Sequence, residues 1–152
     1  MKKKLKRPEQ ALQIAAIKFL ELAAPADLFF TAINPIPNKS PIVAALSKAM
    51  GLRPGVADLL FIYEGRPLFI EMKAKGGSES DSQEATRGLA ERARTQTVIC
   101  RSIEEMESRL RFFGVPLRAT VLTALGADDT RATVLTALEA HSDAGNVLEA
   151  AQ

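Results

Sequence analysis

Two apolar runs separated by a very short break constrain the fold of this sequence most strongly. Residues 57–63 and 67–73 are rich in Leu, Ile and Phe, and they flank Glu64-Gly65-Arg66. Apolar runs of strand length that are joined by a short, glycine-containing break are typical of a β-hairpin. The sequence therefore predicts two adjacent antiparallel strands in the middle of the chain.

This hairpin brings three charged residues together. Side chains alternate across a strand, so Glu71 and Lys73 are expected on one face, with Ile70 and Met72 on the other. The hairpin also returns Asp58, near the start of the first strand, to the end of the second. Two carboxylates and an ammonium are therefore expected to converge at one end of the hairpin.

The segments around the hairpin predict an α/β fold. Strands are expected at 28–33 and 96–101, and a loop with three prolines at 34–41. Helices are expected at 8–24, 42–50, 81–94 (capped by Ser80 or Asp81) and from a capping box at Ser102-Ile103-Glu104-Glu105 to Gly114. This order predicts a mixed sheet of about four strands covered by helices, with a right-handed crossover between the second hairpin strand and the last strand.

The tail differs from the rest of the chain. Residues 118–125, Arg-Ala-Thr-Val-Leu-Thr-Ala-Leu, recur letter for letter at 131–138. Two copies are too few for a solenoid, and the pattern fits either helices or strands. We expect one domain at 8–118, followed by a tail at 119–152 that serves in self-association.

Composition and charge indicate the cellular compartment and the kind of partner. Cys100 is the only cysteine of the 152 residues, so no disulfide forms within the chain. No apolar run approaches the roughly 20 residues that cross a membrane, and we expect a cytoplasmic protein. The net charge of the chain is +2. From Ala119 onward there are five acidic residues and one arginine, so the part of the chain before Ala119 is basic. A basic body suits a polyanionic partner such as DNA.

The three converging charges suit a hard divalent cation. Two nearby carboxylates repel each other unless a cation lies between them, and Mg²⁺ or Mn²⁺ prefers such oxygen ligands. A metal held there would polarise a phosphoryl oxygen, and Lys73 could stabilise the charge that develops. The alternatives are a Glu71–Lys73 surface pair and an Asp58 that caps the turn after Gly55. The combination at hairpin spacing favours the functional interpretation.

The same residues resemble a known family. Asp58 followed by Glu71-Met72-Lys73 across a hairpin resembles the PD-(D/E)xK nuclease superfamily. The stretches 51–60 and 69–74, followed by Gln83, resemble more narrowly the VRR-NUC family of virus-type replication and repair nucleases. The resemblance covers about residues 8–118. It implies a restriction-endonuclease-like core and a metal-dependent endonuclease for branched or repair-type DNA, including four-way junctions. It also implies a homodimer and a bacterial or phage-infected cell as the setting.

The resemblance also implies residue roles. Asp58 and Glu71 would be metal ligands, and Lys73 the catalytic lysine. The backbone carbonyl of Met72 would complete the metal shell, and Gln83 would lie beside the site.

Further correspondences are less direct. Glu9 matches a first-helix acid that joins the metal site through water, although it could equally be a first-turn acid that complements the helix dipole. The loop at 36–39 resembles a segment near the substrate, or is a solvated loop. Ala57 stands where the family often has proline, and we expect chemistry to survive this change because proline supplies no ligand.

Other charged residues and motifs carry weaker signals. Four basic residues could line a phosphate track or be ordinary surface charges: Arg53, Arg66, Lys75 and Arg87. The only histidine is His141, which excludes a His-based metal centre, and no phosphate-binding loop of an ATPase is present. Cys100 is expected in the core.

The sequence therefore predicts a Mg²⁺- or Mn²⁺-dependent DNA endonuclease. Two alternatives stay open at this point. One is a nuclease fold that binds nucleic acid without cleaving it, and the other is a structural or assembly protein whose repeated tail is the working part.

Overall fold

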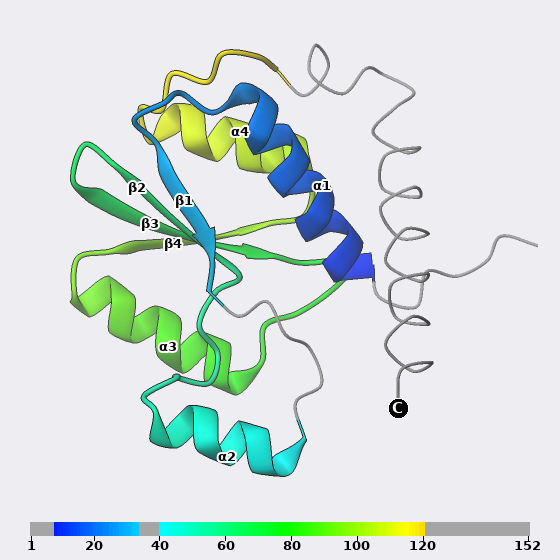
Figure 1. Cartoon of the computed structure of the whole chain (residues 1–152), viewed down its shortest axis with the longest axis vertical. Coiled ribbons are helices and arrows are strands. Elements are labelled where there is room, and N and C mark those ends of the chain that lie inside the picture. The colour runs from blue at the N-terminus through cyan, green and yellow to red at the C-terminus, as the bar shows by residue number, and fades with distance from the viewer. Residues whose placement is uncertain (1–7, 34–39, 121–152) are drawn as a thin grey trace, which may run out of the picture. The chain divides into compact units, whose positions relative to one another are not determined.

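The computed structural model describes residues 8–33 and 40–120 and shows an α/β fold (Figure 1). In these ranges the chain forms four helices and four strands: α1 (Pro8–Ala23), β1 (Phe29–Ala32), α2 (Pro41–Ala49), β2 (Leu59–Tyr63), β3 (Arg66–Met72), α3 (Asp81–Arg92), β4 (Gln96–Cys100) and α4 (Ile103–Phe112). The predicted fold class is confirmed. The interior of the proline-rich loop, the repeated tail and His141 lie outside the described residues.

The chain divides into two compact units. Among the described residues, one unit contains 8–25 and 101–120, and the other contains 26–33 and 40–100. In the first unit α1 and α4 pack against each other, and the amide of Arg118 donates to the carbonyl of Ala23 at 2.7 Å. No helix of the described ranges is long and apolar enough to cross a membrane.

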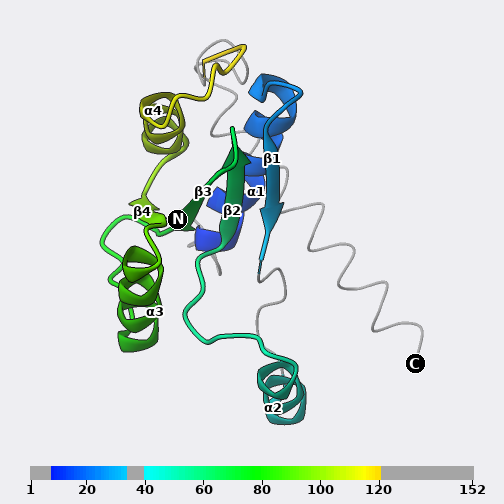
Figure 2. The ribbon, with the colours of Figure 1, turned by 90° about the vertical axis from the view of Figure 1, so that its left-hand side faces the viewer.

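The second unit contains the sheet, whose strand order is β1-β2-β3-β4. The first three strands are antiparallel neighbours, whereas β3 and β4 are parallel. Parallel neighbours need a long crossover, and α3 supplies it. The mixed sheet of four strands is thus confirmed. Outside this sheet, α2 lies apart from the strands in both views (Figures 1 and 2), and none of its residues is buried.

A two-residue turn closes the hairpin. Glu64 and Gly65 both have positive φ angles, 49° and 71°, as the type I′ turn requires, and Tyr63 pairs with Arg66 directly beyond them. Arg66 therefore begins β3, whereas the sequence had suggested that it belongs to the connection. The tighter turn fits the right-handed twist of the two strands.

The two faces of the hairpin differ sharply. One face is an apolar core whose members are at most 1% exposed: Leu59, Phe61, Leu68, Ile70 and Met72. The other face carries Phe69 and Glu71 and is turned toward α3. The predicted alternation, with Ile70 and Met72 opposite Glu71, is therefore confirmed.

Serine side chains begin three of the helices. Ser40, Ser80 and Ser102 each accept a hydrogen bond from a backbone amide of the first turn. Ser80 caps α3, which resolves the choice between Ser80 and Asp81. At α4 the predicted capping box is only half formed, because the carboxylate of Glu105 accepts from the amide of Arg101 at 2.7 Å.

Gly55 holds the loop before β2 against the start of α3. Its φ is +77°, and a Cβ built there would lie 2.1 Å from the carbonyl oxygen of Ser82 and 2.5 Å from the amide nitrogen of Gln83. Only glycine lets two backbones approach this closely at a positive φ. The contact places the loop that ends in Asp58 directly beside the first turn of α3.

Replacing Gly55 by alanine is expected to destabilise the protein much more than replacing Gly76. Gly76 has a similar φ, +83°, but open space around it, so Gly76→Ala measures the backbone strain alone. The clash in Gly55→Ala should cost an additional 1–3 kcal/mol or so in the free energy of unfolding. Urea denaturation of both variants checks this. Equal losses would show that the loop does not press on α3.

Candidate active site

The register of the hairpin places Asp58 opposite Glu71. Leu59 pairs with Ile70, so the next position along each chain brings Asp58 and Glu71 to the same level and the same face. Asp58 lies just before β2, so the predicted strand began two residues too early. Its backbone carbonyl accepts from the amide of Ile33 at 2.9 Å, next to the end of β1.

The side chain of Asp58 is fixed to the end of β3. Its Oδ2 accepts a hydrogen bond from the backbone amide of Met72 at 2.8 Å. A hydrogen bond from an amide to a carboxylate is stronger than one between neutral groups, and this one is partly buried. The bond holds the Asp58 carboxylate beside the peptide that joins Glu71 to Met72.

Glu71 and Lys73 form a buried ion pair. Their residues are 6% and 8% exposed, and Nζ of Lys73 lies 3.3 Å from Oε1 of Glu71. The amide of Lys73 also donates to the carbonyl of Cys100 at 2.9 Å, which fixes its backbone just beyond β3. Carboxylates and ammonium groups are rarely buried unless they are paired or bound to a metal. The buried pair at the end of β3 is therefore unusual for a sheet of this kind.

Gln83 joins the start of α3 to this pair. Its amide oxygen accepts from the amide of Ser80 at 2.9 Å in a reciprocal capping box, and its Nε2 donates to Oε1 of Glu71. The two ends of the side-chain amide are thus assigned by their partners. The structure brings the predicted Gln83 into direct contact with the predicted Glu71.

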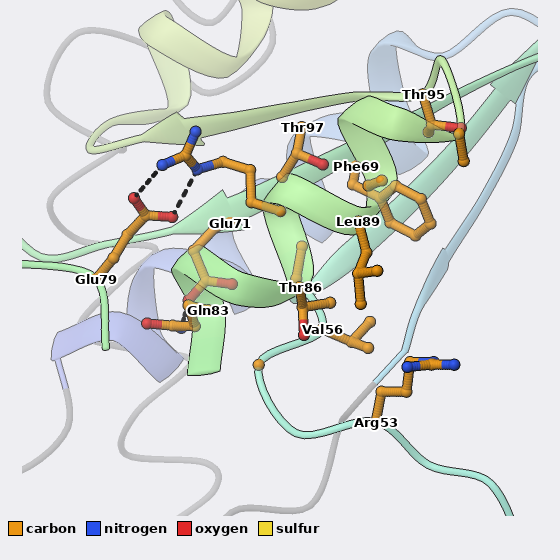
Figure 3. Close-up of a pocket in the computed structure, with 15 residues that line it drawn as sticks. Arg53, Val56, Phe69, Glu71, Glu79, Gln83, Thr86, Leu89, Thr95 and Thr97 are labelled. Atoms are coloured by element: carbon orange, nitrogen blue, oxygen red, sulfur yellow. Dashed lines mark hydrogen bonds and ion pairs between the residues drawn. The ribbon is translucent and has the colours of Figure 1, made fainter. Parts of the chain in front are cut away.

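A pocket of about 340 Å³ opens beside Glu71 and Gln83. It lies between α3, the β3–β4 face and the loop around Gly55, and Figure 3 shows its walls. Glu71 and Gln83 lie at one side in this view, and Phe69 and Leu89 at the other. The candidate site therefore borders a cavity large enough for part of a substrate.

Of the basic residues predicted to line a phosphate track, two line this pocket, Arg53 and Arg87. Arg87 is held by Glu79 at 3.1 and 3.3 Å and by Glu91 at 2.9 Å. The hydrogen bonds that Arg87 donates to Glu79, and secondly to Glu91, raise the pKa of Arg87 above its ordinary value.

The other two members of that set lie elsewhere. Arg66 sits at the hairpin turn and contacts Glu64 at 3.4 Å. Glu71 lies five positions farther along the strand, roughly 16 Å away, so the structure does not bring Arg66 to the site. Lys75 is exposed in the segment that follows Lys73.

The remaining predicted metal ligands are placed as follows. Met72 follows Glu71 at the end of β3, with its side chain buried on the opposite face. Glu9 is exposed in the first turn of α1, in the other compact unit, and its assignment stays a prediction. Within residues 8–33 and 40–120, no group of three or more His, Cys, Asp or Glu side chains is arranged to hold a metal. The arrangement at the hairpin consists of two carboxylates and a lysine.

Sequence reasoning missed some of the supporting residues. Ser80 was expected as a helix cap, but its role in orienting Gln83 toward Glu71 was not. The Ser80-x-x-Gln83 spacing is the signature of a capping box and could have revealed it. Glu79 contacts Arg87 because of how the segment before α3 folds, and no local sequence pattern predicts this contact.

Comparison with known proteins gives a limited result. No family model and no curated protein matches the sequence. Among solved structures, a protein described as a VRR_NUC domain protein has a similar backbone, with a TM-score of 0.49 and 17% sequence identity. The match covers 75% of this chain and 91% of that one. At this distance the likeness carries no residue roles.

Removal of the Asp58 carboxylate is expected to destabilise the hairpin end. Asp58→Ala leaves the partly buried amide of Met72 without this acceptor, which should lower the free energy of unfolding by about 1–3 kcal/mol. Asp58→Asn keeps an oxygen acceptor and should lose clearly less. Urea denaturation of both variants tests this. If alanine and asparagine had the same effect, the hydrogen bond would contribute nothing.

Proposed function

We propose that this protein is a divalent-metal-dependent nuclease that hydrolyses phosphodiester bonds in DNA. The observation that carries the proposal is the buried Glu71–Lys73 pair with the Asp58 carboxylate fixed beside the same strand end. These residues correspond in type and spacing to the motif that the sequence shares with PD-(D/E)xK nucleases. The geometry supports the proposal because it gathers the three groups on one side of the sheet.

The donor set fits a hard cation. Glu71 and Lys73 are buried, and Asp58 and Glu71 supply two carboxylates, which would attract a cation. Mg²⁺ and Mn²⁺ are held by one or two carboxylates together with water and substrate oxygens. Two carboxylates are therefore sufficient, and the carbonyl of Met72 is the proposed third protein ligand.

Each residue has a defined task in the proposed reaction. Asp58 and Glu71 would hold the metal, which would polarise the phosphoryl oxygen and lower the pKa of a bound water. Lys73 stabilises the negative charge that develops on the phosphoryl oxygens as water attacks. Gln83 keeps the Glu71 carboxylate in one orientation through the capping box of α3. Preorganisation of this kind reduces the reorganisation needed during reaction.

The finer features of the proposal come from the family resemblance. They are a preference for branched or repair-type DNA such as four-way junctions, a homodimer that presents two centres to two strands, and a water-mediated contribution from Glu9. A two-fold dimer is also the commonest arrangement of soluble homo-oligomers.

Replacing Lys73 by alanine is expected to lower Mn²⁺-dependent DNA cleavage by about 100-fold or more, because a preorganised charge on the transition state is lost. Cleavage is measured on a panel of single-stranded, duplex and four-way-junction DNA. Lys48→Ala, which removes an exposed lysine of α2, is the control and should retain full activity. Circular dichroism confirms that both variants are folded.

The same assay distinguishes the alternatives. A parent protein that binds the DNA panel without cleaving it under any metal condition would identify the non-cleaving binding module. Cleavage that persists unchanged in folded Lys73→Ala would remove Lys73 from the mechanism and identify a different centre or a contaminant.

Metal binding gives an independent test. Isothermal titration of the full chain with Mn²⁺ should show binding that Glu71→Gln weakens at least tenfold, because an amide is a poorer ligand than a carboxylate. Glu84→Gln removes an exposed carboxylate from α3 and should leave the Mn²⁺ affinity unchanged. Equal affinities for both variants and the parent would contradict the assignment of Glu71 as a ligand.

A further inference from the structure

The pocket beside Glu71 extends well beyond the polar end at which Gln83 lies. Its far side is formed by the side chains of Val56, Phe69 and Leu89, which Figure 3 shows around the open space. Leu89 is 42% exposed although it is a large apolar residue of α3. Small side chains, Ala90 and Ala93, keep this part of the space open. An apolar hollow therefore adjoins Glu71, one of the proposed metal ligands.

A few hydrogen-bonding groups are distributed over these apolar walls. The hydroxyl-bearing side chains of Thr95 and Thr97 line the β4 side, and Arg53 lies on the loop side. Apolar surfaces with a small number of placed polar groups are typical of pockets for small planar ligands, and 340 Å³ falls at the lower end of their size range of roughly 300–1,000 Å³.

The charge of the pocket argues against a phosphate as its occupant. Arg87 lines the pocket beside Glu79, and two carboxylates, Glu79 and Glu91, engage its guanidinium. The charged residues of the lining are two arginines, Arg53 and Arg87, and two glutamates, Glu71 and Glu79, so the pocket has no excess positive charge. A neutral, flat group with hydrogen-bonding edges suits this environment better than an anion does.

We propose that the pocket binds one nucleobase of the nucleotide next to the scissile phosphodiester. The inference rests on the proposed nuclease function and names its substrate class. A base that is stacked within a continuous duplex must first be unstacked and unpaired before it can enter such a pocket, which costs free energy. The favoured substrate is therefore DNA with an unpaired base at the cleavage position, as in single strands and at the branch points of junctions.

The first arm of the test varies the substrate. Single-stranded oligonucleotides carry one abasic nucleotide, moved one position at a time across the main cleavage site. We expect kcat/KM of the parent protein to fall about tenfold or more at one position and little elsewhere, because one stacked base is lost. A fully paired duplex of the same sequence should be cleaved at least tenfold more slowly than the intact single strand.

The second arm fills the pocket. Ala90→Phe adds a large side chain to a residue that lines the pocket, whereas Ala85→Phe adds the same side chain to an exposed position of α3 outside it. Ala90→Phe should reduce cleavage of the intact strand to the level seen with the critical abasic strand and abolish the difference between the two. Ala85→Phe should behave as the parent does, and unfolding curves verify that both variants fold.

The outcomes distinguish failure of the base pocket from failure of the proposed nuclease function. Cleavage by the parent that is indifferent to every abasic position, or equally fast on continuous duplex, overturns the base pocket and leaves the nuclease proposal standing. Retention of the abasic effect in folded Ala90→Phe also overturns it. Absence of metal-dependent cleavage of any DNA overturns the nuclease proposal, and the base pocket with it.

Discussion

The hydrogen bond from the amide of Met72 to the carboxylate of Asp58 is the interaction on which the candidate site depends. Asp58 precedes β2 and has no place in the ladder of the hairpin, so its side chain supplies the connection that the backbone does not. The bond fixes the end of a loop that Gly55 already presses against the first turn of α3. Strand end, loop and helix start are thereby held together around Glu71.

Local helix chemistry serves the site as well. Ser80 and Gln83 form a capping box, which satisfies backbone amides at the start of α3. Because the side-chain oxygen of Gln83 accepts from the amide of Ser80, the side-chain nitrogen points toward Glu71 and donates to its carboxylate. A device that ordinarily stabilises a helix by about 1 kcal/mol here also restrains a buried carboxylate. Stability and preorganisation consequently depend on the same few atoms.

The sequence predicted the local features well and the charge pairing poorly. Alternation of apolar residues determines the faces of β2 and β3, and Ser80 marks the start of α3, because both signals lie within a few residues. The end of a strand depends on its partner, and β2 begins only at Leu59, where it meets Ala32 of β1. The fold likewise determines which carboxylate engages each arginine. From the sequence, Arg66 and Arg87 appeared available to bind phosphate, but Glu64 and Glu79 contact them.

The energetics of the buried pair favour a role beyond stability. Two charges removed from water recover their desolvation cost only with excellent geometry, and apolar residues of similar volume often do as well or better. Glu71 lies in a strand whose neighbours Phe69, Ile70 and Met72 are apolar, so a further apolar residue would fit the pattern there. Asp58 places a second carboxylate at the same strand end, beside the peptide that joins Glu71 to Met72. An arrangement that is costly for folding and gathers two carboxylates and a lysine is what the proposed cation site requires.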